Sequence, residues 1–247
     1  MSPTDLPFKP RFYFHAEGHA LSGEFRRPIR HLIEAQAATS LSTIGGHARI
    51  RTENFNADHL ASFRLGHTHV SGTRQDDVTV TTHTTTTIEH LNILDVVTAD
   101  RVVSRLTSQH KHGKLEGHII ALGTHFDNLR IAGYEVKVTL RHELFLECET
   151  FDKLRKKVAT DKDSGKIAWT GDKTVLCSLV EKIETKLPGV DGRSHVINVP
   201  HFGQISLAEI FAEPGTRTLT MLRLDLGSPH DATLTVAENR INGTTWP

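Results

Sequence analysis

Cysteine is scarce in this chain of 247 residues, which holds only Cys148 and Cys177. Two cysteines cannot build a disulfide framework or a zinc site of four thiolates. Each lies in an apolar stretch, so a buried free thiol is the expected state, and a bridge between the two is the alternative.

Long hydrophobic runs are missing as well. No stretch approaches the ~20 apolar residues that a membrane helix needs, so no membrane insertion is expected. The first residues, MSPTDLPFKPRFYF, lack a basic region followed by an apolar core, and they therefore do not form a secretory signal. The cytoplasm is the default compartment, and the cell surface is the alternative.

Excess charge and aromatic platforms are also lacking. Lys and Arg together number 29, as do Asp and Glu, so the formal net charge is zero and no nucleic acid partner is expected. Near-zero charge is compatible with self-association. Two Trp and two Tyr offer few stacking surfaces for sugars or single strands.

Threonine is abundant in one place, the stretch from Val78 to Leu91. Seven of the nine residues from 79 to 87 are threonine, which favours strands because its branched side chain fits a pleated surface. In a strand, Val80, Thr82, Thr84, Thr86 and Ile88 share the more apolar face. The stretch therefore predicts a long antiparallel strand with one buried face and one wet face.

Further strands of the same kind are indicated along the chain. The segment from Tyr134 to Phe145 alternates apolar and polar residues with a period of two. One short helix is predicted near 150–160, with Thr150 as its cap and Phe151, Leu154 and Val158 as its apolar stripe. We therefore predict an all-β fold, an antiparallel β-sandwich or barrel of long strands.

The chain shows a short internal repeat. Gly46-His47 is followed by Phe55, and Gly117-His118 is followed by Phe126 at the same interval. This favours a single β-rich domain over residues 1–247 with an internal duplication of about 30–60 and 95–140, because a solenoid would need more copies.

Residues 97–100, VTAD, together with 126–133, FDNLRIAG, resemble the repeating unit of uncharacterised bacterial "choice-of-anchor" domains. The similarity covers roughly residues 93–140 and, more weakly, 30–60. It implies a repeated-strand sandwich or barrel with a role at a surface or in an assembly, and it supplies no catalytic residues.

Seventeen histidines are an excess that requires an explanation. His67 and His69 have the His-x-His spacing that places two imidazoles on one face of a strand, within reach of one metal ion. His15, Glu17 and His19 form a second candidate set for a divalent metal. The alternatives are that these side chains extend a half-buried face, or that histidines line an interface that acid opens.

No nucleophile elbow, P-loop or dinucleotide fingerprint is present, so no catalytic residue is predicted. The leading hypothesis is a non-catalytic structural protein that forms homo-oligomers or filaments through strand edges and an N-terminal arm. The arm residues chosen as interface candidates are Pro3, Phe8, Phe12 and Phe14. The alternatives are a metal-dependent β-barrel enzyme that uses a His-x-His pair and a ligand-binding β-barrel.

Overall fold

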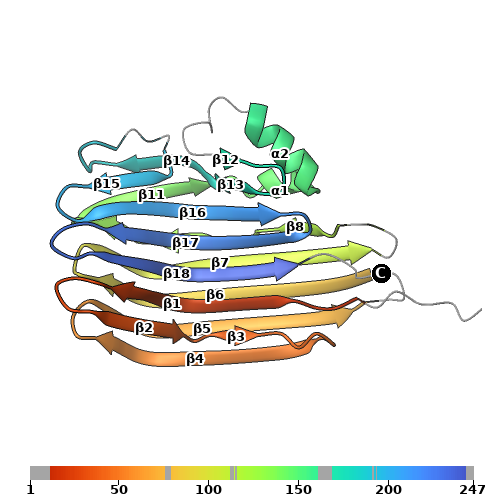
Figure 1. Cartoon of the computed structure of the whole chain (residues 1–247), viewed down its shortest axis with the longest axis horizontal. Helices are drawn as coiled ribbons and strands as arrows, with labels where there is room; N and C mark the ends of the chain where they lie inside the picture. The colour runs from red at the N-terminus through yellow and green to blue at the C-terminus, as the bar shows by residue number, and fades with distance from the viewer. Residues whose placement is uncertain are drawn as a thin grey trace, which may run out of the picture.

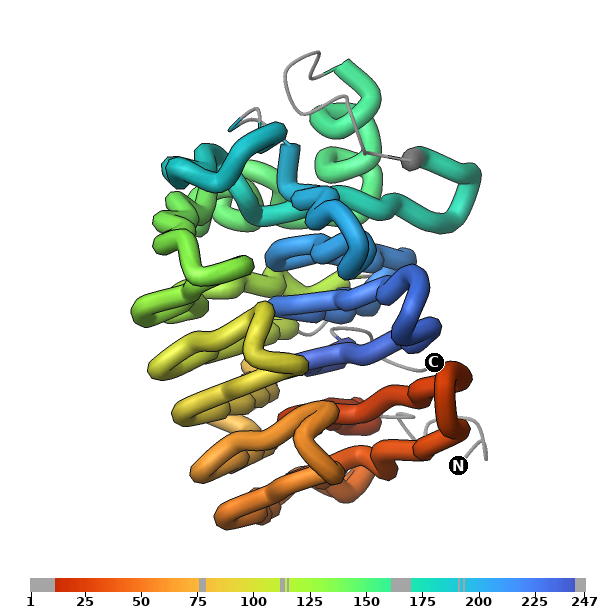
Figure 2. The backbone as a smooth tube through the Cα atoms, turned by 90° about the vertical axis from the view of Figure 1, so that its left-hand side faces the viewer, coloured from red at the N-terminus to blue at the C-terminus, as the bar shows by residue number. Residues whose placement is uncertain are grey.

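The computed structural model describes residues 12–75, 79–111, 114, 116–160, 169–190, 192 and 194–242. About 64% of the described residues are in strands and 7% in helices, arranged as two antiparallel sheets that face each other. Figures 1 and 2 show the two layers. The predicted all-β sandwich is confirmed, and the sheets do not close into a barrel.

One layer, sheet A, lies at the front of Figure 1. Its strands, in spatial order, are β12 (Trp169–Thr170), β13 (Val175–Ser178), β16 (Gly203–Glu213), β17 (Thr216–Leu226), β18 (Ala232–Asn242), β1 (Ala16–Phe25) and β2 (His31–Gln36). Two short strands join it, with β15 (Val196–Val199) on β16 and β3 (Thr39–Ser40) on β1.

The other layer, sheet B, lies behind it. Its strands, in spatial order, are β14 (Val180–Thr185), β11 (Tyr134–Leu140), β10 (Arg130–Ile131), β7 (Val97–Lys111), β6 (Thr79–Ile93), β5 (Ala61–Arg74) and β4 (Gly46–Ala57). The short strands β8 (His118–Ile120) and β9 (His125–Asp127) both pair with β7.

Helices lie at one end of the sandwich. Helix α1 (Leu144–Glu147) and helix α2 (Phe151–Thr160) sit beside β8, β12 and β13, at the top of Figure 1. The predicted helix near 150–160 is confirmed: the amide of Lys153 donates to Thr150 Oγ1 over 3.3 Å, and Phe151, Leu154 and Val158 are buried. One sequence prediction at this end was wrong: the strand indicated from Tyr134 to Phe145 stops at Leu140, and α1 begins at Leu144. After the helices, Val175–Ser178 and Val180–Thr185 are two strands, one in each sheet.

The threonine stretch forms the centre of sheet B. Strand β6 pairs with β5 over one edge and β7 over the other, and Thr82, Thr84 and Thr86 are buried between the sheets as the alternation predicts. The hydroxyls of Thr84 and Thr86 donate to Asn239 Oδ1 of sheet A over 2.9 and 2.7 Å. Asn239 Nδ2 in turn donates to the Ser104 carbonyl over 2.8 Å. Polar contacts therefore link the two layers across an otherwise apolar core.

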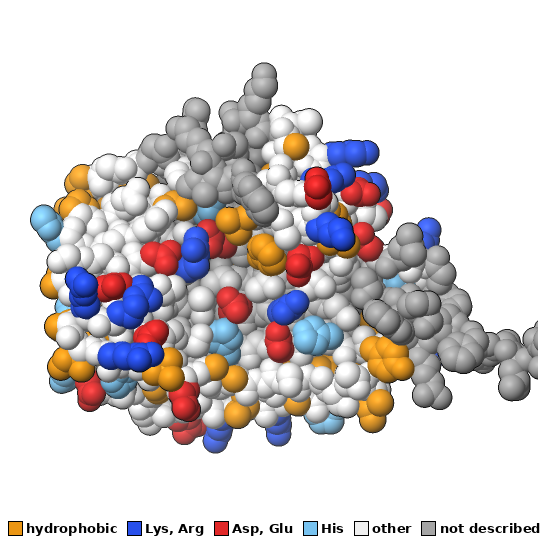
Figure 3. All heavy atoms as spheres, in the orientation of Figure 1, with side chains coloured by type: hydrophobic (Ala, Val, Ile, Leu, Met, Phe, Trp, Pro, Cys, Tyr) orange, Lys and Arg blue, Asp and Glu red, His pale blue; other side chains and the backbone are white. Residues whose placement is uncertain are grey.

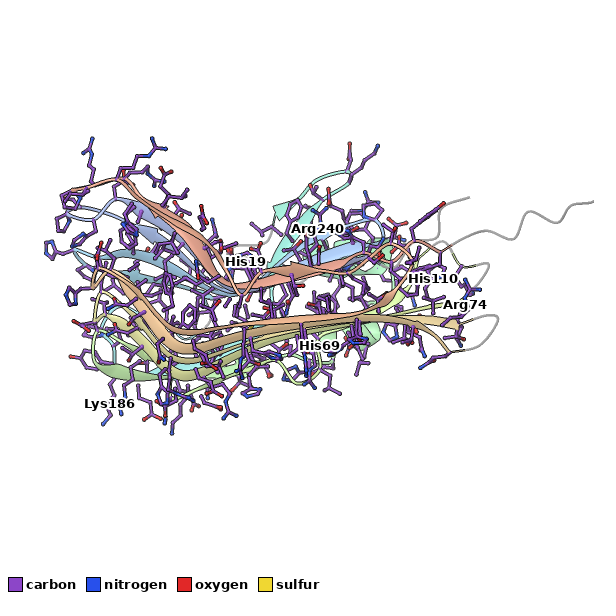
Figure 4. All side chains as sticks on the ribbon, turned by 90° about the horizontal axis from the view of Figure 1, so that it is seen from below. His19, His69, Arg74, His110, Lys186 and Arg240 are labelled. Atoms are coloured by element: carbon purple, nitrogen blue, oxygen red, sulfur yellow. The ribbon has the colours of Figure 1, made fainter. Side chains whose placement is uncertain are left out.

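Both sheets bend partway along their strands, and Figure 4 shows His19 beside the bend of β1. In sheet A, Ala208 and Ala237 have φ of 48° and 51° and lie opposite Met221, the residue between them. In sheet B, Asn54 and His90 have φ of 51° and 53° and face the same residue of β5. These left-handed residues interrupt the alternation of side chains, so that neighbouring residues of one strand are both buried.

Candidate functional site

The end of the sandwich opposite the helices is formed by two strand edges. Strand β4 is the last strand of sheet B, and β2 with β3 ends sheet A (Figures 1 and 2). Strand β4 is 12 residues long and pairs only with β5, and within the described part of the chain no strand occupies its other side. We call this end, residues 29–57, the open edge. A row of unpaired backbone groups along such a strand can pair with another chain.

Exposed apolar side chains are spread along the open edge, from Ile44 before the start of β4 to Ile29 near its end. Ile29, Leu32, Ile44 and Ile50 are 77%, 65%, 88% and 42% exposed. Single exposed apolar residues are common on protein surfaces, but a group of them beside an unpaired strand is typical of a contact surface.

The charges of β4 allow two attractive pairs between copies of this strand. Arg49, Arg51 and Glu53 are exposed at a spacing of two residues, so all three side chains lie on the same face. Arg51 Nε lies 3.3 Å from Glu53 Oε1. In an antiparallel pair of two β4 strands related by a two-fold axis, a register centred on Arg51 places Arg49 opposite Glu53 of the second strand, twice. The same register places the two Arg51 side chains opposite each other, and each keeps its own Glu53 as a neighbour.

The predicted N-terminal arm does not present its aromatic residues to solvent. Phe12 and Phe14 are only 8% and 6% exposed, with their ring centroids 5.0 Å apart. Phe14 packs so closely against the backbone of Gly45 and Gly72 that neither position has room for a Cβ. These two residues are therefore part of the protein's own core, and the other two candidates, Pro3 and Phe8, lie outside the described residues.

The His-x-His pair lies on the outer face of β5, where His69 points away from the sandwich in Figure 4. Cross-strand partners of His67 and His69 on β4 are Arg51 and Arg49. Burial, and then the charges of His69, Arg49 and Arg51, lower the pKa of His67. Because guanidinium groups repel cations, the arginines beside His67 and His69 favour an anion over a metal ion.

The second candidate metal set is not gathered around a common point. His15 Nε2 lies 3.8 Å from Glu17 Oε1, whereas His19 Nε2 is within 3.1 Å of Thr235 Oγ1 and 2.8 Å of Ser22 Oγ. Burial lowers the pKa of His19, against the opposing effect of Glu238 and Glu17. Beside it lies an open hollow of about 430 Å³, whose lining includes Glu17, His19, Glu238 and Arg240.

Among the described residues, no three His, Cys, Asp or Glu side chains are grouped so that they could hold a metal ion. Cys148 and Cys177 are buried free thiols, and burial raises the pKa of Cys177 to about 12. In the same part of the chain, no helix has the length and apolar character required to span a bilayer.

Sequence reasoning missed a buried ionic group on sheet A. Glu209, 5% exposed, accepts hydrogen bonds from Arg223 Nε and Nη2 over 2.7 and 3.0 Å, and His195 Nε2 lies 3.4 Å from it. Burial alone would raise the pKa of Glu209, but His195 and Arg223 outweigh it and lower the value to about 2. Glu209 lies on β16, Arg223 on β17 and His195 just before β15, so no local sequence motif indicates the group. The only signal was a glutamate in the apolar run 205–212.

These features define an all-β sandwich with one open edge. A family model described as "Domain of unknown function (DUF8256)" matches residues 12–166 and 151–213, so the chain belongs to this family. The match does not connect the chain with the choice-of-anchor repeats. No curated protein and no solved structure matches the chain.

Proposed function

We propose that this protein is a non-catalytic structural subunit that self-associates by antiparallel pairing of β4 with β4 of a second copy. The observation that carries the proposal is the contrast between the two ends of the sandwich. Helices lie at one end, whereas the other end has a 12-residue strand with one unpaired edge and exposed Ile and Leu side chains along it.

Pairing across β4 would extend both layers. Sheet B would continue from one copy into the next through backbone hydrogen bonds, and the β2 edges of the two copies would approach each other, because the sheets of a sandwich lie only ~10 Å apart. The exposed side chains of Leu32 and Ile50 would then be buried against apolar groups of the second copy. Charged residues on an edge strand usually prevent pairing, but Arg49 and Glu53 of β4 attract each other in the proposed register.

The test is the mass of the protein in solution, measured by sedimentation velocity. The wild type is expected to be a dimer. Ile50→Lys and Glu53→Arg should each weaken the dimer by about tenfold or more, because each places an unpaired charge against the partner strand. A charge swap, Arg49→Glu with Glu53→Arg, should restore much of the affinity.

Matched controls lie away from the open edge. Leu122→Lys is the control for Ile50→Lys, because Leu122 is 61% exposed and the change is again from apolar to charged. Glu135→Arg is the control for Glu53→Arg, because Glu135 is an exposed residue of the internal strand β11. Both control variants should remain dimeric. A monomeric wild type, or a dimer that Ile50→Lys and Glu53→Arg leave intact, contradicts the proposal.

The metal-enzyme alternative gains no support, because His67 and His69 stand among arginines. The ligand-barrel alternative lacks a closed barrel.

A further inference from the structure

The register of sheet B collects histidines and arginines from four strands on one face. Three consecutive cross-strand rows lie on the outer face of β4, β5, β6 and β7. The first row is His47, Ser71, His83 and Thr107; the second is Arg49, His69, Thr85 and Arg105; the third is Arg51, His67, Thr87 and Val103. We call these twelve residues the basic face.

The basic face contains seven basic side chains and no carboxylate. The nearest acids belong to the next row, where Glu53 lies beside Arg51 and Glu89 pairs with Arg64. By contrast, the outer face of sheet A, seen in Figure 3, mixes side chains of both signs. A net charge of zero therefore conceals a local excess of positive charge on one side of the sandwich.

The electrostatic state of the histidines agrees with this geometry. His69 and His83 have their ring centroids 6.3 Å apart. Burial, and then the positive charges of Arg105 and His69, lower the pKa of His83. The hydroxyls of Thr85 and Thr107 hold the His83 ring, at 2.7 Å from Nε2 and 2.9 Å from Nδ1. Among the described residues, Arg51 is the one basic group of the face with an ion-pair partner, Glu53, so the other six are prepared for an anion brought from outside.

We propose that the basic face binds a sulfated polysaccharide. The face extends over four strands, about 14 Å at the usual strand spacing, which is too wide for one tetrahedral anion and suits a polymer that carries several. Arginine pairs with sulfate oxygens through two parallel hydrogen bonds, and the threonine and serine hydroxyls between the arginines add further donors. The inference does not depend on self-association, because one copy holds all twelve residues.

Shape and composition favour this polymer over nucleic acid. Figure 4 shows His69 on the straight part of sheet B, and the bend at Asn54 and His90 lies beyond the third row. The basic face is therefore a short patch that a few units of a thin chain can cover. The twelve residues of the face include no Phe, Tyr or Trp, so it offers no aromatic platform for bases. A sulfated chain does not need an aromatic platform, because it is recognised through its charge.

The experiment is titration calorimetry of the full chain with a heparin hexasaccharide. Binding is expected near neutral pH and should weaken as salt rises, because charged groups on an exposed face are screened. Arg105→Gln should lower the affinity about three- to tenfold, since it removes one charge-assisted contact. Arg130→Gln is the matched control: it removes an exposed arginine of the same sheet, on β10, outside the three rows, and should leave the affinity unchanged.

The histidines give the binding a second signature. Acidification to about pH 5.5 should tighten it, because protonated histidines add positive charge to the face and attract the anion. The double variant His67→Asn, His69→Asn should bind as the wild type does near neutral pH and lose most of this gain. Circular dichroism at both pH values confirms that the variants are folded.

Absence of binding, equal loss for Arg105→Gln and Arg130→Gln, or tighter binding of a DNA duplex than of the hexasaccharide would each overturn the proposal. Neither Arg105 nor His69 lies on β4, so these variants should leave the mass of the protein unchanged. Failure of the basic face is thereby separated from failure of the open edge.

Discussion

At the scale of single residues, burial and pairing determine the charge of Glu209. Its pKa of about 2 lies below the ordinary 4.5, so the folded protein holds this proton less tightly than the unfolded chain does. A lowered carboxyl pKa stabilises the fold above the unfolded value, and the stabilisation is lost as pH falls towards 2. The size of the effect is on the order of 3 kcal/mol.

We therefore predict that Glu209→Gln makes the free energy of unfolding less dependent on pH in the acidic range. Between about pH 5 and pH 2 the wild type should lose on the order of 3 kcal/mol more unfolding free energy than the variant, measured by urea denaturation at each pH. At neutral pH the variant should be less stable, because Arg223 loses its buried carboxylate partner and keeps only Asp225. The exposed Glu135→Gln serves as control. Parallel curves for wild type and Glu209→Gln would contradict the assignment.

Asn54 is a second residue with a testable local property, a left-handed backbone conformation. It is exposed on β4 with φ of 51°, a region that asparagine and glycine accept and β-branched residues avoid. Asn54→Val should therefore destabilise the protein by about 1–2 kcal/mol, although valine favours strands, whereas Asn54→Gly should be nearly neutral. Thermal unfolding measures both changes. The same substitution at Glu135, an exposed strand residue away from the open edge, is the control, and an equal effect at both positions would show that the backbone at Asn54 is not responsible.

At the scale of elements, the buried threonines of β6 differ in how they are satisfied. Thr84 and Thr86 donate to Asn239, whereas Thr82 Oγ1 has no hydrogen-bond partner among the described residues. A buried hydroxyl without a partner costs about 1–3 kcal/mol, and valine has nearly the same shape. We predict that Thr82→Val stabilises the fold by about 1 kcal/mol, whereas Asn239→Ala destabilises it by about 3 kcal/mol or more because two hydroxyls lose their acceptor.

Chemical denaturation of both variants tests this prediction, with Thr87→Val on the outer face of β6 as the matched control for the substitution itself. If Thr82→Val is destabilising while Thr87→Val is neutral, then the Thr82 hydroxyl has a partner and the argument fails.

Sequence patterns predicted these elements well where one face is dry and the other wet. The threonine strand and the helix near 150–160 both follow from residue spacing alone. The bends did not, because Ala208 and Ala237 carry no sign of a left-handed backbone, which neighbouring strands impose on them. The change of sheet at Leu179 was missed for a similar reason: its amide bonds to the Ala208 carbonyl, a contact between distant segments.

Surfaces were harder to predict than elements, since they depend on strand order and register. The His-x-His spacing did place His67 and His69 on one face, but their arginine neighbours come from β4, and the pairing of β4 with β5 is not visible in the sequence. The apolar character of Phe12 and Phe14 was recognised, whereas their burial in the protein's own core depends on Gly45 and Gly72, which leave space for the rings.

At the scale of the whole molecule, charge is separated although the total is zero. The basic face adjoins the open edge, because Arg49, Arg51 and His47 all belong to β4. A dimer formed through β4 would join two basic faces side by side, so the electrostatic cost of assembly should depend on how many of their histidines carry a proton.

This arrangement predicts that acid dissociates the dimer. Lowering the pH from about 8 to about 5 charges histidines on both copies and adds repulsion across the open edge, so the dimer should weaken by about tenfold or more. Light scattering at the two pH values measures the mass, and circular dichroism separates dissociation from unfolding. His47→Asn should reduce the effect, whereas His201→Asn, exposed on a loop before β16, should not. A wild-type mass that stays constant while the fold is intact would show that histidine charge does not control the assembly.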